Sequence, residues 1–169
     1  FNESKYNKNV IFVKTDNLGD LICWITIYKK FLSNKEIKNS SLVIINEKWL
    51  TLVKDLNLFK EILPVNTNLF RSSIIYRIKI LFKVRRISCN FLINPTRSRA
   101  FLTDDTLSRF IKSKEKIRFE NDDVHMTWYE NIISNFQEFT EIKIKYSSEH
   151  LNHNYFLDYI NKRFFRLKL

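Results

Sequence analysis

The stretch Val10–Leu32 reads VIFVKTDNLGDLICWITIYKKFL, and it decides the fold of this chain. Val10–Lys14 is a short apolar run rich in β-branched residues, which predicts a buried strand. Asp20–Leu32 carries apolar residues at helical spacing and ends near a Lys-Lys pair, which predicts an amphipathic helix. The turn between them holds Gly19, the only glycine in the 169 residues. A buried strand followed at once by such a helix is the repeating unit of an α/β fold.

The rest of the chain repeats this alternation. Further strands are expected at Leu42–Asn46, Glu61–Val65, Asn90–Asn94 and Lys116–Phe119, with a weaker strand candidate at Glu141–Tyr146. Helices are expected at Glu47–Leu56, Leu69–Ile87, Thr103–Ile111 and from about Glu149 to Phe165. Continuous apolar strands between helices predict a mainly parallel sheet with helices on both faces and Val10–Lys14 at its centre. We therefore expect residues 1–169 to form a single Rossmann-like domain.

The composition favours anionic partners. Lys and Arg number 29 against 18 Asp and Glu, so the net charge is +11. Nucleic acid, acidic lipid headgroups and phosphorylated sugars all fit this charge. The alternative is compositional drift, because a chain rich in Lys, Asn and Ile with one Gly and two Pro is typical of an A/T-rich genome. No signal peptide and no apolar run of the ~20 residues that span a membrane is visible, and a first residue Phe1 suggests a fragment.

The two cysteines predict no disulfide and no metal site. Cys23 and Cys89 both lie among apolar residues, which is typical of reduced core cysteines in a cytosolic protein. A metal site would also need more ligands than the sequence brings together. Glu149, His150 and His153 put two imidazoles on one helical face without a third ligand at a clear spacing.

The first βα turn holds the main candidate site. A lone glycine at such a turn indicates a positive φ or the close approach of a ligand, and ligands of open α/β sheets bind beyond the carboxyl ends of the strands. Asp20 would start the helix, where unpaired N–H groups favour its ionised form. The alternative role for Asp20 is an ordinary N-cap. The turn lacks the glycines of a dinucleotide fingerprint.

Six segments, taken in their order along the chain, carry a resemblance to a known family. They are VIFVKTDNLGD with its helix, SLVIINEKW (Ser41–Trp49), LFKEILPV (Leu58–Val65), NFLINPTRSRA (Asn90–Ala100), KSKEKIRF (Lys112–Phe119) and EHLNHNYFLDY (Glu149–Tyr159). Together they resemble glycosyltransferase family 9, the ADP-heptose:lipopolysaccharide heptosyltransferases, over nearly the whole chain. One departure is Arg118-Phe119-Glu120, which lacks the glycine that this family has at the end of the corresponding strand.

The resemblance implies the N-terminal half of a GT-B fold, which binds the acceptor in an inverting, metal-independent sugar transfer. It aligns Asp20 with the aspartate that serves as the catalytic base, whose help is typically worth ~10²–10⁴-fold. The donor, ADP-heptose or a similar nucleotide sugar, would bind to a second domain that these residues do not include. The chain alone is then not expected to complete the reaction. The implied location is the cytoplasm, including the cytoplasmic face of the inner membrane.

Basic residues near this turn predict an anionic, lipid-linked glycan acceptor. Lys14 ends the first strand, and Arg97 and Arg99 leave the strand Asn90–Asn94 at the same sheet edge, where guanidinium groups can hold phosphate. Thr15, Asn17 and Gly19 complete the expected acceptor site. The alternative is a solvated loop.

The helix Leu69–Ile87 leaves two interpretations open. It combines an apolar stripe (Phe70, Ile74, Ile78, Leu81, Phe82) with a basic face (Arg71, Arg77, Lys83, Arg85, Arg86). Such a helix can lie on an anionic membrane or contact a phosphorylated acceptor. Alternatively, its stripe is core and its charges are a solvated face.

The sequence leaves two alternatives to an active glycosyltransferase open. A nucleic-acid-binding module is favoured by charge alone, since no recognition motif surrounds the aromatic pair Trp128-Tyr129. An inactive remnant of a glycosyltransferase is a third reading. The acidic pairs Asp104-Asp105 and Asp122-Asp123 are expected at helix starts and loops and not as paired catalytic carboxylates.

Overall fold

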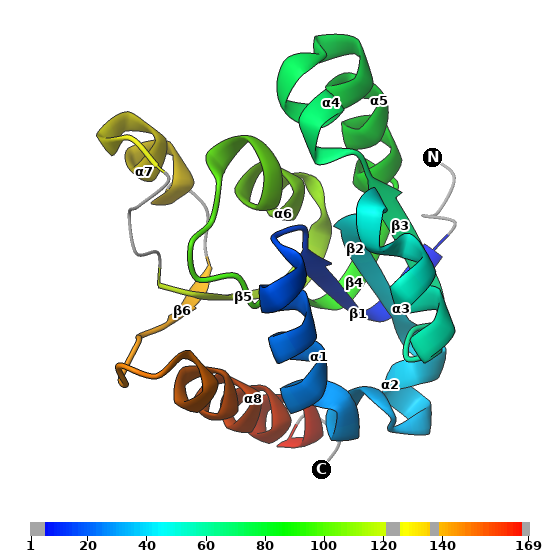
Figure 1. Cartoon of the computed structure of the whole chain (residues 1–169), viewed down its shortest axis with the longest axis vertical. Helices are drawn as coiled ribbons and strands as arrows, with labels where there is room; N and C mark the ends of the chain where they lie inside the picture. The colour runs from blue at the N-terminus through cyan, green and yellow to red at the C-terminus, as the bar shows by residue number, and fades with distance from the viewer. Residues whose placement is uncertain (1–5, 121–125, 136–138, 167–169) are drawn as a thin grey trace.

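A parallel sheet forms the centre of the molecule. The computed structural model describes residues 6–120, 126–135 and 139–166. Its strands are β1 (Tyr6–Lys14), β2 (Ser41–Asn46), β3 (Glu61–Val65), β4 (Ile87–Asn94), β5 (Lys112–Phe119) and β6 (Thr140–Ile142). Their order across the sheet is β3-β2-β1-β4-β5-β6, and each neighbouring pair is parallel (Figure 1). The predicted parallel sheet with a central first strand is confirmed.

Helices cover both faces of this sheet, as predicted. One face carries Val10 and Phe12 and packs against α1 (Leu18–Leu32), α2 (Lys35–Ser40), α3 (Leu50–Leu56) and α8 (Glu149–Arg166). The other carries Ile11 and Val13 and packs against α4 (Thr67–Ser72), α5 (Ile74–Arg85) and α6 (Thr106–Phe110). A further helix, α7 (Trp128–Asn135), lies away from the sheet at the upper left of Figure 1. The fold is therefore α/β and Rossmann-like.

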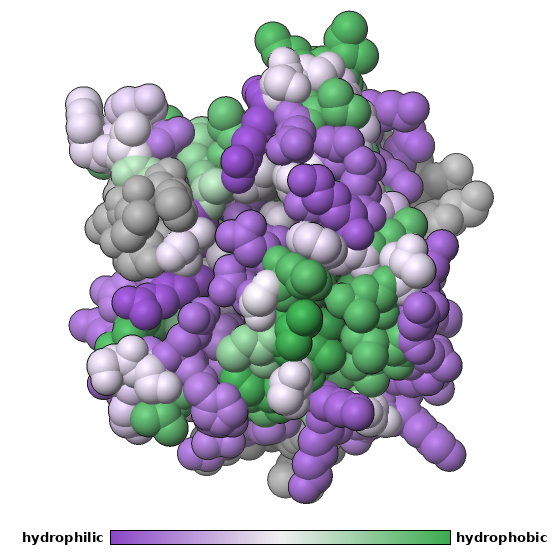
Figure 2. Space-filling view, viewed as in Figure 1, coloured by the Kyte–Doolittle hydropathy of each residue, from purple (hydrophilic) through white to green (hydrophobic). Residues whose placement is uncertain are grey.

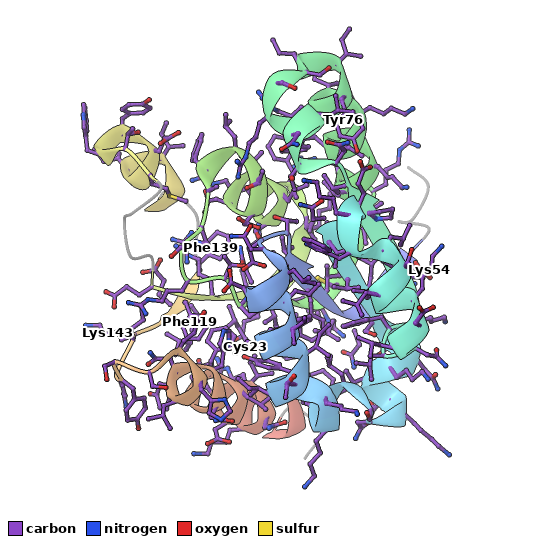
Figure 3. All side chains as sticks on the ribbon, viewed as in Figure 1. Cys23, Lys54, Tyr76, Phe119, Phe139 and Lys143 are labelled. Carbon is purple, nitrogen blue, oxygen red and sulfur yellow. The ribbon has the colours of Figure 1, made fainter. Side chains whose placement is uncertain are left out.

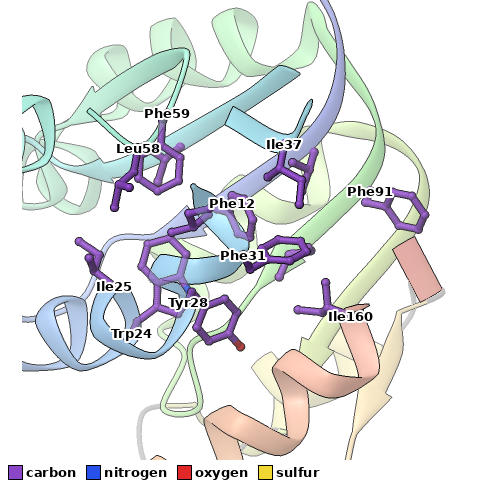
Figure 4. Packing of buried hydrophobic residues seen from close by; sticks show 14 of the residues in the cluster. Phe12, Trp24, Ile25, Tyr28, Phe31, Ile37, Leu58, Phe59, Phe91 and Ile160 are labelled. Atoms are coloured by element: carbon purple, nitrogen blue, oxygen red, sulfur yellow. The ribbon is translucent and has the colours of Figure 1, made fainter. Parts of the chain in front are cut away.

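An aromatic cluster fills the core between β1 and α1. Figure 4 shows Phe12 at its centre, with its ring centroid 5.4 Å from that of Trp24, 6.4 Å from Phe31 and 6.0 Å from Phe59. Each of these side chains is buried. Full burial of one large apolar side chain stabilises a fold by about 1.5–3 kcal/mol. This cluster fixes the position of α1 on β1, and with it the turn that joins them.

The predicted single helix at Leu69–Ile87 is wrong. Two helices, α4 and α5, are separated at Ser73, whose backbone is extended (φ −111°, ψ 113°). The Ser73 side chain caps α5 by accepting a hydrogen bond from the Tyr76 N–H at 3.3 Å. The Arg77 guanidinium holds the break by donating to the carbonyl of Phe70 at 2.7 Å. The apolar residues continue at helical spacing through Ser73, but Ser73 ends α4 and its side chain caps the start of α5.

The two helices form a hairpin that projects beyond the sheet at the top of Figure 1. Figure 3 shows Tyr76 within it, where its hydroxyl accepts a hydrogen bond from the Asn66 N–H at 3.0 Å. Of the apolar stripe expected to be core or membrane-facing, only Phe70 is buried. Leu81 is half-buried, and Ile74, Ile78 and Phe82 are exposed. The interpretation of this stripe as core therefore fails for most of its length.

Other helices and strands begin or end a few residues away from their predicted bounds. The expected helix Thr103–Ile111 is a π-helical turn (Phe101–Asp105) followed by α6. The expected helix Glu47–Leu56 begins as a 3-10 turn and ends at Asn57 in the left-handed conformation (φ 48°), which Asn tolerates better than most residues. Ile87 opens β4 and does not close a helix.

Two smaller findings bear on function. Both cysteines are free thiols, with Cys89 buried and Cys23 half-buried. Burial raises the pKa of the Cys89 thiol to about 12. Within residues 6–120, 126–135 and 139–166, no helix combines the length and apolarity required to cross a bilayer.

Candidate functional site

The turn after β1 positions the predicted catalytic residue. The strand ends at Lys14 and α1 begins at Leu18, so Asp20 lies in the first helical turn as its third residue. The N-cap is Asn17, whose side chain makes no capping hydrogen bond. The alternative role of Asp20 as an N-cap is therefore wrong. Its carboxylate lies instead in the first turn of α1, at the positive end of the helix dipole.

The predicted positive φ at Gly19 is also wrong. The structure describes no glycine with positive φ, and Gly19 is an ordinary helical residue. A Cβ added there would meet no atom within 4 Å. The second reason given for this glycine, the close approach of a ligand, stays a prediction.

A polar pocket opens beside this turn. It has a cavity volume of about 240 Å³ and is lined by Asp16, Asn17, Asp20, Thr96, Arg97, Ser98 and Glu149. Three separate parts of the chain build it: the turn after β1, the loop after β4 and the first residue of α8. The first two leave the sheet at the carboxyl ends of neighbouring parallel strands, which is where open α/β sheets bind ligands. The volume suits a ligand below drug size.

Asp16 is the most perturbed acid in the pocket. Its Oδ2 is 2.6 Å from the Lys14 Nζ and accepts a hydrogen bond from the Thr96 hydroxyl at 3.3 Å. Its Oδ1 is buried without a hydrogen-bond partner among the described residues. Burial raises the pKa of the Asp16 carboxyl to about 6, against the opposing effect of the Lys14 ammonium, and Asp104 adds to the increase. Asp16 therefore changes charge close to neutral pH.

The two residues before Asp16 lie behind the pocket and hold its lining residues in place. Lys14 is almost fully buried, and its ammonium is paired with Asp16. The Thr15 hydroxyl donates to the buried carboxylate of Asp104. The Trp49 indole N–H donates to the Asp16 carbonyl at 3.3 Å, which ties the turn to the chain after β2. Neither Lys14 nor Thr15 lines the pocket.

Arg99 lies away from the pocket. Its side chain is buried, donates to the carbonyl of Phe119 and lies 3.9 Å from the carboxylate of Asp105. Asp105 also pairs with Arg118 at 3.0 Å and Arg109 at 2.8 Å. Burial lowers the pKa of Arg99 to about 10, and Arg118 acts in the same direction. This buried cluster joins the loop after β4 to β5, and Arg99 is part of it.

Of the two acidic pairs noted in the sequence, the structure describes only Asp104-Asp105. Asp104 and Asp105 are both buried, and Asp105 precedes α6 without making a capping hydrogen bond. The pair therefore lies at a helix start, as expected, but its carboxylates make buried hydrogen bonds and ion pairs instead of an N-cap hydrogen bond on α6. Asp122 and Asp123 lie outside the described residues. Arg118 of the same cluster also stacks over the ring of Phe139, which Figure 3 marks, with its guanidinium carbon 4.2 Å from the ring centroid.

The first turn of α8 adds a carboxylate that the sequence did not assign to this site. Glu149 lines the pocket, and its Oε1 lies 3.8 Å from the His153 Nε2 one turn later. His153 is buried against the rings of Tyr28 and Phe119. Burial lowers the pKa of His153 to about 4, with smaller contributions from Lys14 and His150. His153 is thus neutral near pH 7. No group of three or more potential metal ligands occurs in the described part of the chain.

The assembled set differs from the predicted one. Of the predicted residues, Asp20, Asn17 and Arg97 reach the pocket; the structure adds Asp16, Thr96, Ser98 and Glu149. Three carboxylates and one guanidinium then face a small polar space. Ionised carboxylates only accept hydrogen bonds, so the pocket suits a ligand that offers hydroxyl groups. An anionic group would find its favourable charge at Arg97.

Comparison with known proteins gives no further guide. No protein-family model, no curated protein and no solved structure matches this chain. The resemblance to the heptosyltransferases therefore stays a prediction. The site has to be interpreted from its own chemistry.

Proposed function

We propose that this chain is the acceptor-binding domain of an inverting, metal-independent glycosyltransferase of the heptosyltransferase type. The observation that carries the proposal is the Asp20 carboxylate, which lies in the first turn of α1 and lines a pocket at the carboxyl edge of the parallel sheet. This is the place that the sequence resemblance assigns to the catalytic base. The pocket chemistry is also that of a hydroxyl-bearing ligand.

In the proposed reaction, the acceptor hydroxyl gives its proton to the Asp20 carboxylate. The hydroxyl oxygen forms a bond to the anomeric carbon of the donor, and the bond from that carbon to the nucleotide diphosphate breaks. The leaving diphosphate takes the electron pair, and in-line attack inverts the anomeric centre. A second domain would hold the donor, ADP-heptose or a similar nucleotide sugar. Asp16 and Glu149 would accept hydrogen bonds from neighbouring hydroxyls and orient the acceptor.

The acceptor class follows from the charges. Among the described residues that line the pocket, Arg97 is the only basic one. A phosphate on the acceptor would therefore bind at that side, while the sugar hydroxyls face the acids. A phosphorylated, lipid-linked glycan has both groups. Such an acceptor places the protein in the cytoplasm, at the cytoplasmic face of the inner membrane.

The base is tested by Asp20→Asn in the full-length product of the reading frame that contains this chain. Amide and carboxylate are nearly isosteric, but only the carboxylate takes a proton, so transfer should fall by ~10²-fold or more. Asp55→Asn, at an exposed position on α3 away from the pocket, is the matched control. Release of nucleotide diphosphate measures the rate. Activity of Asp20→Asn within about threefold of wild type would remove Asp20 as the base.

Acceptor binding is tested on the chain itself by calorimetric titration with phosphorylated lipopolysaccharide core. Arg97→Ala should weaken binding by about 1.5–3 kcal/mol through loss of one charged hydrogen bond. Lys30→Ala, at an exposed position in the last turn of α1, is the matched control. Duplex DNA is titrated in parallel over a range of salt, because several phosphate contacts would make its affinity fall by ~10³-fold or more between low and moderate ionic strength. Tight, steeply salt-dependent DNA binding with glycan binding unchanged by Arg97→Ala would favour the nucleic-acid function instead.

A further inference from the structure

The outer face of α5 is apolar and unusually exposed. The exposed fraction is 83% for Ile75, 68% for Ile74, 66% for Phe82 and 47% for Ile78. These four positions fall on one side of the helix, because successive residues rotate by about 100° and 74, 78 and 82 are each one turn apart. Figure 2 shows hydrophobic surface at the tip of the α4–α5 hairpin with hydrophilic surface beside it. Large apolar side chains grouped in this way mark an interaction surface.

The α4–α5 hairpin itself carries charge of a single sign. No Asp or Glu occurs between Glu61 and Asp104, a stretch that includes the whole α4–α5 hairpin. The exposed basic residues of the hairpin are Arg71, Lys79, Lys83, Arg85 and Arg86. Lys79, Lys83 and Arg86 follow the side of α5 next to the apolar face. A partner for this surface must therefore be both apolar and anionic.

A hollow beside α5 repeats this combination. Its cavity volume is about 850 Å³, and its lining includes Lys79, Lys83 and Arg86 together with apolar Leu63 and Phe82. Among the described residues of the lining, Glu61 is the one acid, and it is paired with Lys8. On the other side of Phe82, an apolar hollow of about 440 Å³ extends to Phe110. The hairpin thus offers basic groups for phosphate and apolar spaces for hydrocarbon, side by side.

We infer that the outer face of α5 docks this protein on a bilayer that contains anionic phospholipid. Ile74, Ile75, Ile78 and Phe82 enter the boundary between headgroups and acyl chains, and Lys79, Lys83 and Arg86 contact the headgroup phosphates. Interfacial helices bind in this way, through buried apolar area plus attraction to anionic lipid. The tip of the hairpin lies at the carboxyl edge of the sheet, because α4 follows β3 and α5 returns to the start of β4. The polar pocket lies at that same edge.

A second apolar patch provides the matched control. Leu18, Ile22, Leu52 and Leu56 are partly exposed on α1 and α3, where Figure 2 shows hydrophobic surface at the centre of the view. Charges of both signs surround that patch, including Asp20, Asp55 and Lys54. Apolar exposure alone would make both patches bind lipid. The combination with positive charge predicts binding through α5 only.

The test is co-sedimentation of the whole chain with vesicles of phosphatidylcholine, with and without phosphatidylglycerol. Wild type should bind only the mixed vesicles, and added salt should weaken the binding. Ile75→Ser/Phe82→Ser should weaken it at least about tenfold, while Ile22→Ser/Leu52→Ser should leave it unchanged. Lys79→Gln/Lys83→Gln/Arg86→Gln should weaken it on the order of 100-fold, about fivefold for each charge. All substituted side chains of α5 are exposed, so circular dichroism should show native folding.

Several outcomes would overturn the inference. They are the absence of binding to mixed vesicles, equal binding by wild type and both α5 variants, or equal loss in the α1–α3 control. Sedimentation velocity tests one further outcome. If the chain self-associates without binding vesicles, and Ile75→Ser/Phe82→Ser abolishes this self-association, the partner of the α5 face is a second copy of the chain. The inference does not depend on sugar transfer, because it uses no residue of the pocket. A failure of the Asp20→Asn prediction would leave it standing.

Discussion

Replacing Asp16 by Asn should remove one part of the pH dependence of stability. Burial raises the pKa of Asp16 from an ordinary 3.8 to about 6 in the folded protein. Between these values the native state holds more protons than the unfolded state, so the contribution of Asp16 to the free energy of unfolding falls as pH rises. Each pKa unit corresponds to about 1.4 kcal/mol, which makes the full effect about 3 kcal/mol. The carboxylate is favourable for folding when protonated and unfavourable when ionised.

Asn does not titrate, so the variant lacks this effect. The free energy of unfolding of Asp16→Asn minus that of wild type should therefore increase by about 3 kcal/mol from about pH 3.5 to about pH 7. The ion pair with Lys14 forms only when Asp16 is ionised, and its effect is already contained in the folded-state pKa of about 6. Groups common to both proteins cancel in the difference. The pH-dependent part then belongs to Asp16.

Urea unfolding followed by circular dichroism at several pH values measures this difference. Equal dependence on urea in the two proteins would confirm that both unfold in the same way. The ¹³C resonance of the Asp16 carboxyl provides a second measurement, with an expected midpoint of about 6. A difference that stays flat or decreases with pH would refute the placement of Asp16 in a buried environment. In that case its role as an acid that titrates near neutrality would also fail.

Two predictions concern stability at neutral pH. Asp105→Asn should lower the free energy of unfolding by about 3–5 kcal/mol, because Arg118 and Arg109 lose a buried partner. Asp158→Asn, on the exposed side of α8, is the control. Equal losses of stability for the two variants in urea unfolding would contradict the buried cluster. Tyr28→Phe should raise it by about 1 kcal/mol, because the hydroxyl is buried without a hydrogen-bond partner among the described residues. A clear loss of stability in the same assay would instead indicate a partner for this hydroxyl.

The sheet was predictable from the sequence because buried strands leave a strong local pattern. The run from Val10 to Val13 is apolar on both faces, and the structure covers both with helices. The helix after it was equally clear, because its buried residues recur every three or four positions from Leu21 to Leu32. The carboxyl edge of the sheet, and so the location of the site, followed from this topology alone.

The hairpin α4–α5 was not predictable in the same way. The apolar residues continue at helical spacing through Ser73, and periodicity does not distinguish one long helix from two that meet at a cap. The Ser72-Ser73 pair was the available signal, since serine favours helix ends. The exposure of Ile75 and Phe82 depends on where neighbouring elements lie. No local pattern contains that information.

The site itself was half predictable. Asp20 starts the helix after β1 and Arg97 lies in the loop after β4, so topology brings them to one pocket. Arg99 also follows a strand, but its side chain turns inward to the carbonyl of Phe119, a direction that spacing does not specify. Asp16 was visible in the turn, yet its importance comes from burial beside Lys14. Glu149 reaches the pocket only because α8 packs along α1.

This last contact links the pocket to the end of the chain. Glu149 opens α8, and the same helix rests on α1 through His153 against Tyr28 and Phe164 against Phe31, with ring centroids 6.0 and 5.9 Å apart. Figure 1 shows the two helices side by side. A ligand that binds through Glu149 would stabilise the docking of α8 on α1, and a docked α8 would favour binding of that ligand by the same factor. We therefore expect such a ligand to slow hydrogen exchange along α8.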